Sequence, residues 1–286
     1  MPSLSLPPAR QAGATLLPTT RPASAAWLSR SVAAWAVVAL TGQLVFAAYV
    51  LVFYGGAALA GTPERWNEVL PRGWQAGAAF DNAVLAAHLL FTVLIVLGGL
   101  VQLLPVVRRR VPALHRWSGR AYLLAASVLA LGGLHLVWVR GGAAGDLSQH
   151  LAITVNALII LVAATMAWRA ARARDVARHR RWALRLFVAV AGVWFFRVGL
   201  MAWLGVFQAP VGFDPKTFSG PFLTALAWAV YAVLPLAVLE AVLRAQRPGT
   251  APTLQWVVAA GLLAVTLTMA FGAVVATLGM WGPRMA

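Results

Sequence analysis

Cysteine is absent from the 286-residue chain, and charged residues are scarce. Without a thiol, the protein can form no disulfide and can hold no zinc site or iron–sulfur cluster that needs cysteine ligands. Only 10% of the residues are charged, whereas a soluble domain needs about a quarter to cover its surface. Because 61% of the residues are hydrophobic, we expect the surface to face lipid rather than water.

Acidic residues are the scarcest charged type, with 7 against 23 basic residues. The net charge of +16 could indicate nucleic-acid binding. Here, however, the arginines lie between long apolar runs, where anionic headgroups and the cytoplasmic side of a membrane attract them. The expected partner is therefore the lipid bilayer, and not nucleic acid.

About seven apolar runs are long enough to cross a bilayer, which predicts an all-α, polytopic membrane protein. Residues 1–30 are rich in proline, serine, threonine and alanine, so we expect a disordered tail. A single transmembrane domain, residues 31–286, follows it. The expected helices cover residues 33–54, 83–104, 121–139, 150–168, 183–205, 221–243 and 254–279.

Local signals support several helix starts. Asp81 and Asn82 can cap the second helix. Three prolines suit first helical turns, namely Pro112, Pro221 and Pro252. Trp66 and Trp74 lie in the long connection 55–82, where we expect them to anchor a short surface helix at the membrane interface.

The arginines predict the orientation of the chain. Large clusters follow the second and fourth expected helices, at 108–120 and 169–185, and smaller groups lie in the N-terminal tail and after the sixth helix. The connections on the other side hold most of the acidic residues. The positive-inside rule therefore predicts a cytoplasmic N-terminus and an outer C-terminus.

An internal repeat is the most informative feature of the sequence. Residues 88–93 read His-Leu-Leu-Phe-Thr-Val, and residues 150–155 read His-Leu-Ala-Ile-Thr-Val. Each copy opens a helix that ends in arginines and is followed by a second histidine, His115 or His179. Two copies in the same orientation predict a duplicated four-helix core, with repeat units at about 83–139 and 150–205.

The repeat predicts that its histidines recur at matched depths. His88 and His150 would lie near the outer face, and His115 and His179 near the inner face. A histidine pair facing across a bundle is what bis-histidine ligation of a haem requires. One hypothesis is therefore that haem b binds at both levels and carries electrons across the membrane. The alternative is that these histidines are interfacial or packing residues, above all His115 and His179.

Arg197 is unusual because it lies well inside an apolar run, where an arginine is costly without a partner. We expect it to form an outer polar cluster with His88, His135 and His150. It could bind a haem propionate, or the small anion or lipid of a carrier or sensor. It could also pair with Asp146 or with backbone carbonyls. A membrane assembly partner without catalysis is a further alternative.

Other polar residues inside the helices have simpler interpretations. Gln102 and Asn156 are expected to form hydrogen bonds between helices. Glycine pairs at 98–99 and 132–133 are expected to permit close helix packing. Glu240 precedes Arg244 by one turn, which predicts an ion pair within one helix.

The first repeat unit resembles a known family. The stretch from His88 through residues 102–105 (Gln-Leu-Leu-Pro), residues 115–120 (His-Arg-Trp-Ser-Gly-Arg) and Tyr122 is similar to domain of unknown function 2306, a family of bacterial predicted membrane proteins. Residues 179–182, with Arg185 and Arg197, also fit. The resemblance covers about residues 80–205. It implies a polytopic protein of a bacterial inner membrane, and no particular activity.

A weaker resemblance concerns the spacing of the histidines. Their recurrence on four successive helices is similar to the two-haem transmembrane b-type cytochromes that accept electrons from ascorbate. Those proteins pair the first core helix with the third and the second with the fourth. The pairs His88 with His150 and His115 with His179 follow that order, which would imply two haem sites.

Overall fold

The computed structural model describes residues 22–70, 72–140 and 145–286, and every regular element in them is helical. The all-α prediction is confirmed. The long helices are α1 (Ala23–Tyr49), α3 (Ala79–Leu103), α5 (Pro112–Trp138), α6 (Leu147–Arg172), α7 (Val176–Val190), α8 (Gly192–Phe207) and α11 (Pro252–Ala276). The shorter ones are α2 (Gly56–Leu59), α4 (Pro105–Arg110), α9 (Pro221–Trp228) and α10 (Leu234–Ala245).

Three π-helical segments interrupt or extend these helices. They are η1 (Val50–Gly55) between α1 and α2, η3 (Ala229–Val233) between α9 and α10, and η4 (Thr277–Trp281) after α11. Two 3₁₀ turns complete the described elements, η2 (Pro63–Glu68) and η5 (Gly282–Arg284). Because π-helical turns are rare and recur at functional sites, their positions bear on where a site lies.

The number of membrane spans agrees with the sequence. Among the described residues, six helices are long and apolar enough to cross a bilayer. The count is seven if α7 and α8, which are bent by 46° at their junction, are taken as one broken span. The expected tail over 1–30 falls mostly outside the described residues, and α1 already begins at Ala23 rather than near residue 33.

The three prolines predicted helix starts correctly, whereas the predicted caps Asp81 and Asn82 were wrong. Pro112, Pro221 and Pro252 each begin a helix, where a missing N–H costs nothing. Asp81 and Asn82 do not cap α3, because α3 begins at Ala79. Asn82 instead holds the preceding loop, accepting from the Gln75 backbone N–H at 3.1 Å.

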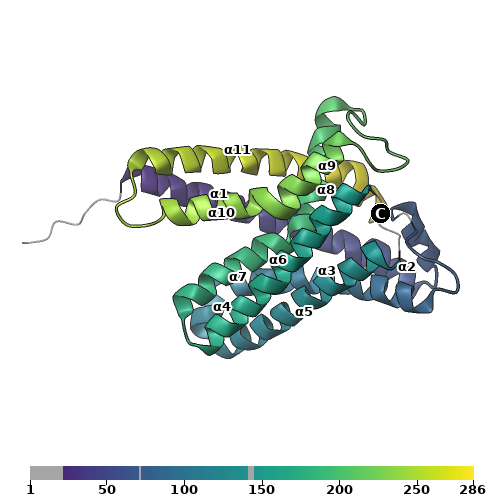
Figure 1. Cartoon of the computed structure of the whole chain (residues 1–286), viewed down its shortest axis with the longest axis horizontal. Coiled ribbons are helices and arrows are strands. Elements are labelled where there is room, and N and C mark those ends of the chain that lie inside the picture. The colour runs from purple at the N-terminus through teal and green to yellow at the C-terminus, as the bar shows by residue number, and fades with distance from the viewer. Residues whose placement is uncertain (1–21, 71, 141–144) are drawn as a thin grey trace, which may run out of the picture.

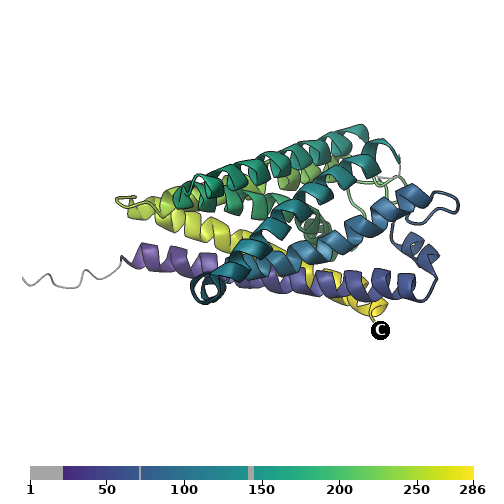
Figure 2. The ribbon, with the colours of Figure 1, turned by 90° about the horizontal axis from the view of Figure 1, so that it is seen from below.

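The long helices form a closed ring. α1 packs on α11, α11 on α8, α7 on α6, α6 on α5, α5 on α3, and α3 on α1. Figure 1 shows α1 and α11 side by side along the bundle, diverging from α5 and α7 toward the end where α1 begins. Figure 2 shows the same elongated bundle from below. A ring of helices of this kind has an interior that side chains must fill.

The two repeat units share local contacts. Thr92 donates to the His88 carbonyl at 2.8 Å, and Thr154 donates to the His150 carbonyl at 2.8 Å. At the opposite end, the Arg120 guanidinium lies 4.6 Å from the centre of the Trp117 ring. The equivalent distance is 4.7 Å for Arg185 and Trp182. The sequence repeat is therefore also a structural repeat at this level.

Other expected packing contacts are present. The Gln102 side-chain amide donates to the His115 carbonyl at 3.0 Å and to the Ser118 hydroxyl at 2.7 Å. A Cβ atom at position 98 would lie 3.1 Å from the Tyr122 ring, so glycine there permits the close approach of α3 and α5. The first observation confirms that Gln102 forms hydrogen bonds between helices, and the second confirms that glycine permits close helix packing.

Candidate functional site

A cavity of about 140 Å³ lies inside the ring of helices. Its walls come from α1, η1, α3, α5, α6 and α8, and from the α7–α8 junction. The lining is mostly apolar and aromatic, with a few polar side chains among them, namely Gln43, Tyr49, Tyr54, His88, Thr92, Asn156 and Arg197. Apolar walls with few polar groups are typical of small-molecule sites.

Several polar atoms around this cavity are buried and have no hydrogen-bond partner within the described part of the chain. They are the Gln43 Nε2, the Trp194 Nε1 and the His88 Nδ1. Gln43 and Trp194 are 4% and 3% exposed. Both atoms are obligate hydrogen-bond donors, and a buried donor left unpaired costs about 1–3 kcal/mol. These donors would therefore gain from an acceptor inside the cavity.

Arg197 brings a positive charge to the same cavity. Its guanidinium carbon lies 5.4 Å from the centre of the Phe46 ring, and one N–H makes a long hydrogen bond of 3.5 Å to the Val193 carbonyl. Among the described residues, no carboxylate forms an ion pair with it. The expected pairing with Asp146 is wrong, because that carboxylate accepts from the Gln149 backbone at 2.9 Å and from the Thr224 hydroxyl at 3.0 Å.

Small residues determine how closely the cavity walls approach. The Trp194 ring reaches the cavity because position 42 is glycine, where a Cβ atom would lie 2.6 Å from that ring. The His88 ring lies over Gly132 and Gly133, whose hypothetical Cβ atoms would be 3.7 and 3.6 Å from it. The glycine pair therefore gives His88 room on the α5 side.

The π-helical segments lie beside this site. Val50 and Tyr54 of η1 line the cavity, and the Tyr54 hydroxyl lies 3.5 Å from that of Tyr49. The η3 segment meets the cavity through Asn156, which donates to the carbonyls of Ala189 at 3.1 Å and Tyr231 at 2.9 Å. The prediction that Asn156 joins helices is confirmed.

The connection between α2 and α3 packs against η1. Trp66 is 3% exposed, and its indole N–H donates to the Tyr54 carbonyl at 3.0 Å. The prediction of an interfacial anchor is therefore wrong for Trp66. Its ring meets the Trp74 ring edge-on at 6.0 Å. The loop thus packs against the segment that carries Tyr54.

The expected outer polar cluster divides into separate groups. His88 and Arg197 line the cavity, whereas His135 and His150 do not. The His135 Nε2 lies 2.7 Å from an Asp81 carboxylate oxygen. The His150 ring packs edge-on against Trp138, with 6.0 Å between ring centres.

His88 and His150 also lie at different depths. His88 contacts α5 at Gly132 and Gly133, whereas His150 contacts α5 at Trp138. At 1.5 Å per residue, this separation along α5 is about 8 Å. The difference arises because α3 begins well before His88, at Ala79, while α6 begins just before His150, at Leu147. The expected equal depth is therefore wrong.

The inner histidines lie near the basic end of the bundle. The His179 Nδ1 is 3.0 Å from the Ala167 carbonyl, which joins α7 to α6. The His115 Nδ1 is buried without a partner among the described residues. The two side chains are close enough to interact electrostatically.

The geometry does not fit a haem between His88 and His150. The cavity beside His88, about 140 Å³, is close to the roughly 150 Å³ that holds a benzene molecule, and a four-pyrrole macrocycle is several times larger. His150 points to a different neighbour, Trp138. Among the described residues, no group of three or more His, Asp or Glu side chains could hold a metal ion.

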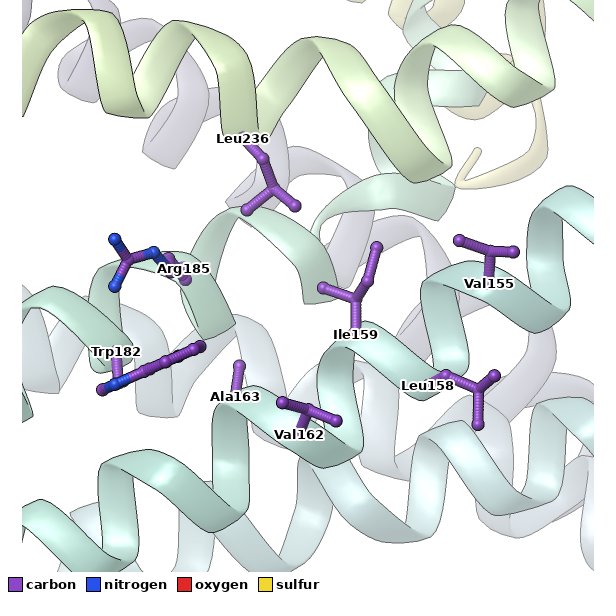
Figure 3. Close-up of a pocket in the computed structure, with 8 residues that line it drawn as sticks. All are labelled: Val155, Leu158, Ile159, Val162, Ala163, Trp182, Arg185 and Leu236. Carbon is purple, nitrogen blue, oxygen red and sulfur yellow. The ribbon is translucent and has the colours of Figure 1, made fainter.

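A second hollow, of about 350 Å³, opens on the side of the bundle between α6, α7 and α10. Figure 3 shows that its walls are aliphatic apart from Trp182 and Arg185 of α7. Arg185 is paired with Glu240 of α10, with N–O distances of 2.6 and 2.8 Å. The expected pair of Glu240 with Arg244 is therefore wrong, and the ion pair joins two helices.

Two important residues of the cavity were missed in the sequence. Gln43 is the one amide in an otherwise apolar stretch of α1, and that isolation was an available signal. Trp194 carries no such signal, because a tryptophan in an apolar run is ordinary. Its unpaired N–H becomes visible once the fold places it against Gly42.

The family model DUF2306, described as a predicted membrane protein, matches residues 85–239. The chain belongs to this family. The DUF2306 region contains His88, Asn156, Trp194 and Arg197, but not α1, which contributes Gln43 and Phe46 to the cavity. The family description agrees with the helical bundle and its apolar spans. No curated protein and no solved structure matches the chain.

Proposed function

We propose that this membrane protein binds a small anion in the cavity beside Arg197, as a carrier or a sensor. The observation that carries the proposal is that the Arg197 guanidinium has no carboxylate partner among the described residues and lines the same cavity as two buried donors without acceptors there, Gln43 Nε2 and Trp194 Nε1. A bound anion would supply the missing charge and the missing acceptors together.

The energetic argument rests on the membrane. An arginine at the centre of a transmembrane helix costs roughly 2.5–3.5 kcal/mol even on insertion scales. Contact with the Phe46 ring offsets part of this free-energy cost, because a cation over an aromatic face contributes about 0.5–2 kcal/mol. An anion in the cavity would pair with Arg197 and so offset the remaining cost of placing a charged arginine in the membrane.

We further propose that the chain lies in a bacterial inner membrane with its N-terminus in the cytoplasm. The arginines of the α3–α5, α6–α7 and α10–α11 connections lie at the end of the bundle where α1 begins, which supports this orientation. The cavity would then be in the outer half of the membrane, beneath the loop that carries Trp66.

The test measures ligand-induced stabilisation of the purified protein. Thermal unfolding is followed in detergent with increasing acetate, benzoate, phosphate or chloride. A ligand at 100 times its dissociation constant adds about 2.7 kcal/mol to the free energy of unfolding. We expect at least one of these anions to raise the melting temperature, and Arg197→Met to abolish the shift.

The matched control is Arg247→Met, which removes an exposed arginine at the basic end. It should leave the shift intact, while Arg197→Lys, which keeps the charge, should retain part of it. If no anion shifts the unfolding of the unmodified protein, the proposal is wrong. A structural or assembly role without a ligand would then be favoured.

The haem hypothesis is checked on the same sample. Protein expressed with added haem would show a Soret band and a bis-imidazole reduced spectrum if histidine pairs held haem b. From the size of the cavity and the position of His150 we expect a colourless protein. A stoichiometric haem spectrum, lost in His88→Leu, would overturn the anion proposal in favour of electron transfer.

A further inference from the structure

The walls of the cavity restrict the anion that it can take. We infer that the ligand is a planar monocarboxylate with one ring, of about the size of benzoate. This inference rests on the proposed anion site and names the class of its ligand.

The size of the cavity limits the ligand to a few atoms. An apolar cavity of roughly 150 Å³ in a folded protein holds one benzene molecule. The cavity here is about 140 Å³. A phospholipid or fatty-acid chain is far larger than this space, whereas a single halide would leave most of it empty. One six-membered ring with a carboxylate matches the volume after small movements of the side chains.

The polar groups match one planar carboxylate. A guanidinium can donate two parallel hydrogen bonds to a carboxylate, and no carboxylate in the described ranges takes them from Arg197. The N–H groups of Gln43 and Trp194 could satisfy the remaining lone pairs. Arg197 is the one basic side chain in the lining besides His88, so a second negative charge would remain uncompensated.

The apolar groups match a ring. Phe46, Tyr49, Tyr54 and Trp194 supply aromatic surface to the cavity. Aromatic side chains favour stacked or edge-on contact with another ring. The remaining walls are mostly aliphatic and come from η1, α3, α5, α6 and the region of the α7–α8 junction. Burying a ring against such walls contributes more than burying the single methyl group of acetate, because the gain grows with apolar area.

The experiment compares four compounds on the unmodified protein in detergent, by isothermal titration. Benzoate is the expected ligand, acetate lacks the ring, benzyl alcohol lacks the charge, and phthalate carries a second charge. We expect benzoate to bind at least tenfold more tightly than each of the others. Ala157→Leu, which fills part of the cavity from α6, should weaken benzoate more than acetate.

The outcomes separate this inference from the proposed function. If acetate binds as well as benzoate, the ring has no role, and if phthalate does, the site accepts a second charge. In either case the inference is wrong while the anion site stands. If benzyl alcohol binds as tightly as benzoate, the site does not select a charge, and both are wrong. If none of the compounds binds, both also fail. Because the comparison uses the unmodified protein, misfolding of a variant cannot obscure it.

Discussion

At the scale of single residues, the buried side-chain amides of Asn156 and Gln43 differ in their hydrogen bonds. The Asn156 side chain donates to two backbone carbonyls, those of Ala189 and Tyr231, and so joins α6 to α7 and η3. Gln43 is equally buried, but its amide nitrogen has no partner. We interpret Asn156 as a structural residue and Gln43 as a ligand-binding residue.

This difference predicts opposite effects on stability. In protein without ligand, Asn156→Leu should lower the free energy of unfolding by about 1–3 kcal/mol, because two carbonyls lose their donor. Gln43→Leu should be neutral or stabilising, because it replaces an unpaired polar group with an apolar one of similar volume. Thermal unfolding of the two variants in the same detergent measures both. A loss for Gln43→Leu as large as that for Asn156→Leu would contradict the interpretation.

Asp146 provides a pH-dependent contact outside the membrane spans. The backbone N–H of Gln149 lowers the pKa of this carboxyl, and the Thr224 hydroxyl contributes to the same shift. A carboxyl whose pKa is lowered on folding stabilises the folded state above its ordinary pKa of 3.8. That contribution is lost as the pH falls below this value.

We therefore expect the unmodified protein to lose stability between pH 5 and pH 3 faster than Asp146→Asn. The variant keeps a side-chain oxygen to cap α6 but has no charge to lose. Parallel melting curves over this range compare the two proteins. Equal slopes would show that Asp146 does not contribute to the loss in acid.

At the scale of helices, the ion pair of Arg185 with Glu240 holds α7 against α10. The two side chains are 24% and 34% exposed, and Arg185 lines the aliphatic hollow of Figure 3. Breaking the pair leaves one charge with little water around it. The local sequence would instead have paired Glu240 with Arg244.

The prediction compares the two arginines directly. Arg185→Gln should lower the free energy of unfolding by about 1–3 kcal/mol, because a partly buried carboxylate loses its partner. Arg244→Gln, at an exposed position one turn from Glu240, should change it by less than about 0.5 kcal/mol. Chemical denaturation in detergent distinguishes them, and the reverse order would favour the pair within one helix.

Helices were predictable from the sequence because lipid requires them. In a bilayer each backbone N–H and C=O must be bonded within the helix, so length and hydropathy suffice to locate a span. The expected helix 221–243 began at the observed residue, Pro221, whereas the helices expected from residues 121 and 254 begin at Pro112 and Pro252. The bend between α7 and α8 had no such signal in the sequence.

The candidate site was predictable only in part. His88 and Arg197 stood out because a polar residue inside an apolar run is costly. The equal depth of His88 and His150 failed because a sequence repeat aligns residues, whereas depth depends on where each helix begins. Partners such as Glu240 for Arg185 depend on contacts distant in sequence, which local spacing does not encode.

At the scale of the whole molecule, the chain has one basic end. The connections α3–α5, α6–α7 and α10–α11 meet there with the start of α1, while the connections α1–α3, α5–α6 and α8–α9 meet at the other end. Arginine is retained on the cytoplasmic side during insertion. In the proposed orientation, the end with the α1–α3, α5–α6 and α8–α9 connections faces outward. The loop that packs on η1 lies at that end.

The absence of cysteine makes this orientation directly measurable. Thr217, between α8 and α9, and Gln246, after α10, are exposed at opposite ends of the bundle. Cells with an intact inner membrane are treated with a membrane-impermeant maleimide. Thr217→Cys should be labelled at once, and Gln246→Cys only after the membrane is permeabilised. The unmodified chain is the blank, since it has no thiol. Labelling of Gln246→Cys alone in intact cells would reverse the orientation and place the anion cavity in the cytoplasmic half of the membrane.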